Sequence, residues 1–141
     1  MTLALDAPGA AERFVRGTLG CGCAEEVFQR VRVDRAQAVG GHPLAWRIDV
    51  GGRLLVYVLE PGGPADLDGG LEELVRAGRA ERDAGGFNRL RVVVAADDPT
   101  LLVAPAQALF GRSGAVDERV HLHVIGREPV EAAVGETDRC A

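Results

Sequence analysis

Cys21 and Cys23 are the residues most suited to chemistry in this 141-residue chain, and they are separated only by Gly22. Thiolates are soft anionic donors that bind zinc, copper(I) or iron–sulfur clusters. One intervening glycine is tighter than the spacing of about two to four residues that is usual in structural zinc sites. Gly22 nevertheless permits the unusual backbone angles that would bring both sulfurs to one centre. The pair predicts a site for a soft metal ion or cluster, with further ligands still needed.

His121 and His123 are the first candidates for those further ligands. On a strand from about Val120 to Ile125, alternation sends both imidazoles to one face of the sheet. Together with the two cysteines they would complete a tetrahedral Cys2His2 set for zinc. A half-exposed strand face without any ligand is the plainer interpretation of the two histidines. The alternative ligands are His42 and Cys140, and the latter is otherwise a bystander near the C-terminus.

A thiol-redox or sulfur-transfer protein is the second hypothesis for the same pair. Cys23 precedes an expected helix, whose N-terminal N–H groups and dipole would lower the pKa of its thiol and make it the attacking thiolate. A strained bridge between Cys21 and Cys23 would be easily reduced. Glu25 and Glu26 oppose thiolate formation. The third hypothesis is a non-catalytic interaction domain in which the cysteines are small structural side chains.

Three carboxylates follow two expected central strands: Glu60 after one, and Asp97 with Asp98 after the next. In open α/β sheets the carboxyl ends of the strands are the usual ligand crevice. The three side chains would suit Mg²⁺. The alternative is that Asp98 caps the next helix and Glu60 faces water.

The composition excludes several classes of protein. The net charge is -5, and the sixteen cations are all arginine and spread along the chain, which argues against nucleic acid as the partner. The absence of lysine excludes Schiff-base chemistry and the phosphate-loop lysine. No apolar run approaches the roughly 20 residues of a membrane span, and no signal peptide is evident. Three cysteines suit a reducing compartment. We therefore expect a cytoplasmic protein with a protein or small-molecule partner.

Hydrophobic periodicity and turn residues predict the secondary structure. The expected elements are a helix over about Pro8–Leu19, strands over Val31–Gln37, Leu44–Val50 and Arg53–Leu59, a helix over Asp68–Ala84, a strand over Arg89–Ala96, a helix from Asp98-Pro99 to Phe110, and a strand over Val120–Ile125. Strand–helix–strand units imply parallel neighbours. The sequence predicts a single α/β domain over residues 1–126. Its mixed sheet has about five strands, a three-strand antiparallel meander followed by two parallel crossover units, with helices packed on it. Residues 127–141 are expected to form a flexible tail.

Gly51-Gly52 predicts a two-residue hairpin turn, because glycine supplies the positive φ angles that such a turn needs. Val50 would then pair with Arg53, and Trp46 would lie opposite Tyr57. The alternating strand Leu44–Val50 is expected at the outside of the sheet, where edge pairing would allow a homodimer.

The run Thr-Leu-Gly-Cys-Gly-Cys-Ala-Glu-Glu-Val-Phe at residues 18–28 resembles the opening of a small family of uncharacterised prokaryotic proteins. Members of that family read Thr-Leu-Gly-Cys-x-Cys-Pro-Glu-Glu-Val-Phe, and Ala24 stands where they have proline. The likeness covers about fifteen residues with their flanks and implies no activity. It implies that Cys21 and Cys23 act as a unit.

Overall fold

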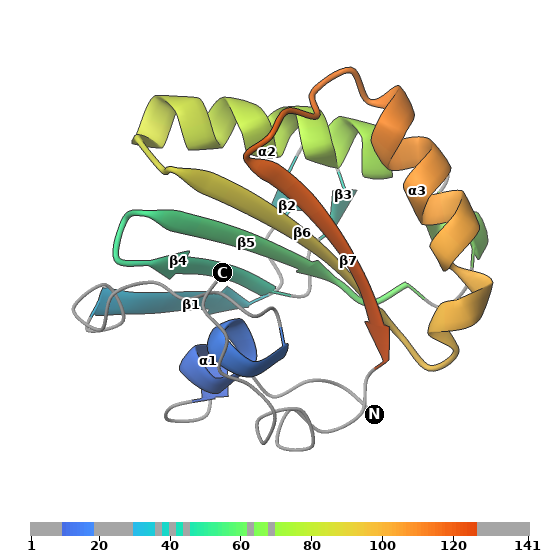
Figure 1. Ribbon diagram of the computed structural model, residues 1–141, viewed down its shortest axis with the longest axis horizontal. Coiled ribbons are helices and arrows are strands. Elements are labelled where there is room, and N and C mark those ends of the chain that lie inside the picture. Colours follow the sequence, from blue (N-terminus) through green and yellow to red (C-terminus); the bar gives the residue numbers. More distant parts are fainter. Residues whose placement is uncertain are drawn as a thin grey trace.

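The computed structural model describes residues 10–18, 30–35, 38–39, 42–43, 46–61, 64–67 and 70–126, which build one mixed sheet with helices on both faces (Figure 1). The sheet has five strands in the order β1-β4-β5-β6-β7, and β2 and β3 form a separate short pair. The elements are α1 (Ala10–Arg13), η1 (Phe14–Thr18), β1 (Val31–Arg35), β2 (Ala38–Val39), β3 (His42–Pro43), β4 (Trp46–Val50), β5 (Leu54–Leu59), η3 (Pro64–Leu67), α2 (Leu71–Gly85), β6 (Arg89–Ala96), η4 (Pro99–Leu101), α3 (Val103–Arg112) and β7 (Val120–Gly126).

The topology confirms the predicted α/β fold. β1, β4 and β5 pair antiparallel, whereas β5, β6 and β7 pair parallel, with α2 and α3 in the two crossovers. β5 is buried along its whole length, and so is β6 after its first residue. This burial is expected for central strands that are covered by helices on both faces. The expected tail, residues 127–141, lies outside the described residues.

The predicted hairpin register is wrong by one residue. Val50 pairs with Leu54, and the turn contains three residues, Gly51, Gly52 and Arg53. Both glycines have positive φ, 61° and 71°, as expected. The N–H of Arg53 bonds back to the carbonyl of Val50 at 3.0 Å, so Arg53 closes the turn and does not extend the strand.

The shift by one residue changes which side chains share a face, because the side-chain period of a strand is two. Tyr57 pairs with Arg47 and packs in the cluster beneath α2. Trp46 pairs with Val58 and packs in the cluster beneath α1. The predicted pairing of Trp46 with Tyr57 is therefore wrong, and the two aromatic rings lie on opposite faces of the sheet.

β4 is an internal strand, which corrects the expectation that Leu44–Val50 lies at the outside of the sheet. It pairs with β1 on one side and β5 on the other, and β1 covers it from Trp46 to Val50. The outer strands of the sheet are β1 and β7. β4 thus has no open edge for the homodimer contact that the sequence suggested.

Each face of the sheet has its own hydrophobic cluster. On the α1 face, Ala11, Phe14 and Val15 pack against β4, β5 and β6. On the opposite face, α2 and α3 cover the sheet (Figure 1). α2 presents the four residues that its periodicity predicted, and all are buried: Leu71, Leu74, Val75 and Gly78.

The helix boundaries follow the turn residues. α2 ends at Gly85, and Gly86 takes the left-handed conformation (φ 75°) with its N–H bonded to the carbonyl of Arg82. Asp98-Pro99 starts only the short η4, and α3 begins at Val103. Among the helices within the described ranges, none is both long enough and apolar enough to traverse a bilayer.

Candidate functional site

β7 places His121 and His123 on the face of the sheet that α1 covers. The alternate residues of the strand, Val120, Leu122 and Val124, pack into the cluster beneath α2 and α3. Ile125 lies two residues after His123 and so on the same face of the strand, and it packs with the α1-face cluster. The predicted alternation of β7 is confirmed, and both histidines are half-buried.

The neighbouring strand β6 supplies two arginines beside these histidines. The Nη1 atom of Arg91 donates to the Nε2 atom of His123 at 2.9 Å. The Nη1 atom of Arg89 lies 3.5 Å from the Nε2 atom of His121, a much weaker contact. Because a guanidinium only donates, Nε2 of His123 must carry the lone pair, and its proton is assigned to Nδ1.

Both histidines are held in the neutral form. Burial and the positive charge of Arg91 lower the pKa of His123 to about 4, and His121 adds to this effect. Burial, Arg91 and Arg89 also lower the pKa of His121, against a small opposing effect of Asp117. Neutral imidazole is the form that ligates metals. However, Nε2 of His123 must first give up its bond from Arg91.

The predicted thiol ligands lie outside the described residues. Cys21, Cys23 and Cys140 all fall there, and the structure describes only the backbone of His42, in β3. η1 ends at Thr18, three residues before the first cysteine of the pair. Whether the four-ligand set comes together therefore stays a prediction.

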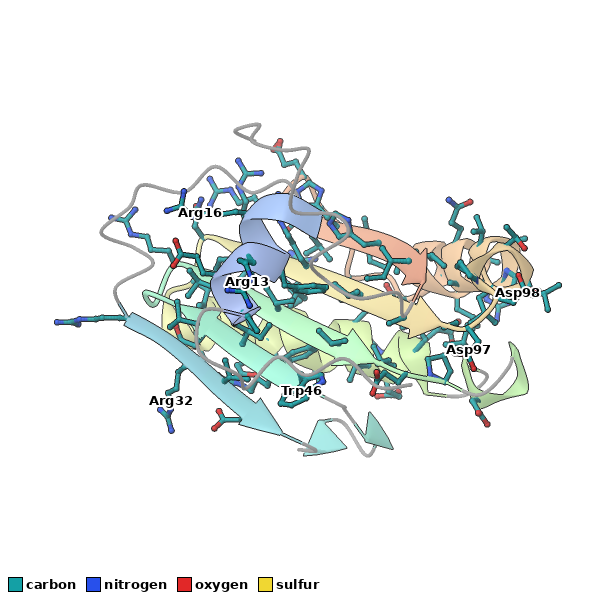
Figure 2. The ribbon with its side chains drawn as sticks, turned by 90° about the horizontal axis from the view of Figure 1, so that it is seen from below. Arg13, Arg16, Arg32, Trp46, Asp97 and Asp98 are labelled. Atoms are coloured by element: carbon teal, nitrogen blue, oxygen red, sulfur yellow. The ribbon has the colours of Figure 1, made fainter. Side chains whose placement is uncertain are left out.

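α1 adds more positive charge on the same side of the sheet. Arg13 and Arg16 both project from the α1–η1 segment (Figure 2), and Arg16 is paired with Glu12 at 2.9 Å. Arg13 is exposed, and Arg91 is only 7% exposed. The sequence shows the run Arg-Leu-Arg at the start of β6. Only the parallel pairing of β6 with β7 places these arginines beside the histidines. Such surroundings favour anionic groups.

The three carboxylates at the other end of the sheet do not form the suggested magnesium site. Within the described ranges, no three His, Cys, Asp or Glu side chains are grouped so that they could hold a metal ion. Asp98 instead accepts a hydrogen bond from the Oγ1 atom of Thr100 at 2.7 Å. Glu60 is half-buried. Asp98 occupies the N-cap position of η4, as the alternative expected, but its side chain makes no capping bond to the backbone.

A polar network beneath α2 escaped the sequence analysis. The buried hydroxyl of Tyr57 donates to Glu81, and the Nε atom of Arg47 donates to the same carboxylate at 3.0 Å. Arg47 also lies 3.5 Å from Asp34. Burial would raise the pKa of Glu81, but the bonds from Arg47 and Tyr57 outweigh it, so the pKa is lowered. Burial and the bond to Glu81 raise the pKa of Tyr57. The network ties α2 to the meander, with Tyr57 held protonated.

The chain was compared with protein-family models, with curated proteins and with solved structures, and no match was found in any of the three.

Proposed function

We propose that Cys21 and Cys23 bind a soft metal ion or cluster through their thiolates, on the face of the sheet covered by α1. One observation carries this proposal: the segment that leads toward the cysteines and the two histidines lie on the same face of the sheet. The segment ending at Thr18 packs on that face, and the neutral imidazoles of His121 and His123 lie on it. We take this face as the place where the two ligand types predicted from the sequence come together.

The charges on this face are compatible with such a centre. A divalent ion held by two thiolates is electrically neutral, and a cluster with several thiolates is anionic, so nearby guanidinium groups do not oppose either. Arg89 is exposed, and its Nη1 atom lies 3.5 Å from the Nε2 atom of His121. His121 is the better additional ligand, because its contact with Arg89 (3.5 Å) is looser than that between His123 and Arg91 (2.9 Å).

Metal content measured by elemental analysis tests the proposal. The protein is purified anaerobically without a histidine tag, as wild type, as C21S/C23S and as the matched control C140S. We expect bound metal or iron with sulfide in the wild type and in C140S, and its loss in C21S/C23S. Less than about 0.1 metal ion per chain in the wild type would refute metal binding. Unchanged metal content in C21S/C23S would refute the assigned ligands.

The histidines are tested separately, by competition with a zinc chelator. H121Q is expected to weaken zinc binding more than H123Q, because only His123 has its Nε2 lone pair occupied by a strong hydrogen bond. A zinc affinity that is unchanged in both variants would show that neither histidine is a ligand and that the other ligands come from elsewhere.

A thiol-redox or sulfur-transfer protein is the second candidate, and the arginines of the α1 face favour it. A nearby guanidinium lowers the pKa of a thiol and so raises the thiolate fraction. The alkylation rate of Cys23 as a function of pH is expected to give a pKa below the ordinary value of about 8.5, and R89Q is expected to raise it. A pKa at or above about 8.5 would remove this candidate. For both candidates we propose a cytoplasmic location, because a reducing compartment keeps the thiols available.

A further inference from the structure

Four exposed arginines lie at one end of the sheet. Arg30 precedes β1, Arg53 lies in the turn between β4 and β5, Arg89 begins β6, and Arg119 precedes β7. They are called the arginine rim below. Since β1 and β7 are the two outer strands, the rim runs across the whole width of the sheet.

Backbone hydrogen bonds fix the members of the rim next to one another. The carbonyl of Arg30 accepts a bond from the β4–β5 turn at 2.8 Å. The carbonyl of Arg53 accepts from the N–H of Arg89 at 3.3 Å, and the carbonyl of Arg119 accepts from the N–H of Leu90 at 2.9 Å. The four side chains therefore start from anchored positions on neighbouring strand ends.

The rim differs in its partners from the six described arginines that form ion pairs. None of its four guanidinium groups forms an ion pair with a carboxylate among the described residues, and the contact of Arg89 is with His121. Glu118, next to Arg119, is an exposed carboxylate in this region. Ion pairs are formed by arginines elsewhere, namely Arg16, Arg47, Arg76, Arg79, Arg82 and Arg112.

The rim gathers four positive charges at this end of a chain whose net charge is -5, beside the carboxylates of Asp49 and Asp117, which accept backbone N–H bonds there. Figure 2 shows Arg32, at the start of β1, toward this end, and Asp97 and Asp98 at the opposite end. Like charges on adjacent strand ends repel one another, and an anionic partner relieves that repulsion. The four rim arginines, which form no ion pair among the described residues, are thus the groups at this end that an anionic partner would bind.

We infer that the arginine rim binds an acidic segment of a partner protein. Five neighbouring strands at a spacing of about 4.8 Å span roughly 20 Å, the length of about six residues of extended peptide. Guanidinium groups pair with carboxylates in a two-bond geometry that other cations do not reproduce. Nucleic acid fits less well, because the protein is acidic overall and Phe87, the aromatic residue beside Asn88 and Arg89, packs against the core instead of offering a stacking face.

Fluorescence anisotropy with three labelled probes tests this inference at low salt. The probes are a decaglutamate peptide, a single-stranded oligothymidylate and a DNA duplex. The peptide is expected to bind the wild type, and R53E/R119E is expected to weaken this binding about tenfold or more. The matched control is R76E/R112E, which changes the net charge equally on the exposed sides of α2 and α3 and is expected to change the affinity less than about twofold.

The circular dichroism spectrum and the melting temperature of both double variants establish that they are folded before binding is compared. Absence of peptide binding by the wild type, or equal weakening in the two double variants, would overturn the assignment of the rim. Tighter binding of either DNA probe than of the peptide, lost in R53E/R119E, would overturn the acidic polypeptide as the partner. This experiment does not depend on whether Cys21 and Cys23 bind a metal, so its outcome is independent of the proposed function.

Discussion

Arg82 and Arg91 are equally buried, each 7% exposed, yet they lie on opposite faces of the sheet in different surroundings. Arg82 donates through Nη1 and Nη2 to both oxygens of Asp117, at 3.1 and 3.0 Å. Arg91 donates to His123, which stays neutral. The ion pair between Arg82 and Asp117 tethers α2 to the loop before β7. The hydrogen bond from Arg91 instead changes what the imidazole of His123 can bind. We expect the Arg82–Asp117 pair on the α2 face to contribute to stability, whereas the α1 face is the one to which the proposed function assigns the chemistry.

The tether between α2 and the loop before β7 is expected to show the largest effect. D117A leaves the guanidinium of Arg82 buried without its principal partner, and we expect a loss of about 3 kcal/mol in the free energy of unfolding. Urea denaturation measures this loss. D83A is the control, since Asp83 contacts the same arginine but is 59% exposed, and the expected cost is below about 1 kcal/mol. Equal losses in the two variants would show that Asp117 has no special role.

Acidification is expected to weaken the α1 face first. The pKa of His123 is about 4 in the folded protein and 6.5 ordinarily, so between these values the unfolded chain binds a proton that the folded protein does not. The free energy of unfolding should therefore decrease by about 2 kcal/mol as the pH falls through this window. The decrease should be smaller in H123Q. Urea unfolding at pH 7 and at pH 4.5 measures both slopes.

The Arg82 tether responds in a separate pH range. Hydrogen bonds from Arg82 and from the N–H of Arg119 lower the pKa of Asp117 to about 2 from 3.8, so its contribution is present above 3.8 and is lost between these values. The decrease in stability between pH 6.5 and 4 should therefore be reduced in H123Q but not in D117A. A decrease that is reduced equally in D117A would contradict the division between the two faces.

Close packing beneath α2 provides the smallest of the expected effects. A Cβ atom on Gly78 would lie 2.8 Å from atoms of both Leu90 and Tyr57, which are fully buried. G78A should therefore cost about 1–2 kcal/mol. G111A in α3 is the control, because its Cβ meets nothing within 4 Å, and it should stabilise the protein by about 0.5–1 kcal/mol. Equal stability of G78A and the wild type in thermal unfolding would show that the helix can move away from the sheet.

Some parts of the molecule were predictable from local sequence. The bounds of β6 were predicted correctly, since a run of apolar β-branched residues between Asn88 and Asp97 has no helical periodicity. The common face of His121 and His123 followed from the strand period. The hairpin register did not follow, because two glycines fit a turn of two or of three residues, and the choice depended on whether Arg53 joined the strand.

The sequence by itself determined the order of strands and helices, the buried side of α2 and the presence of two paired thiols, because each depends on residues close together in the chain. Only the tertiary structure decided that Arg91 would meet His123, that Tyr57 would meet Glu81, and that four arginines would share one end of the sheet. Such contacts depend on the register between strands that are far apart in sequence. A shift of one residue sends every side chain to the other face, so local patterns cannot specify them.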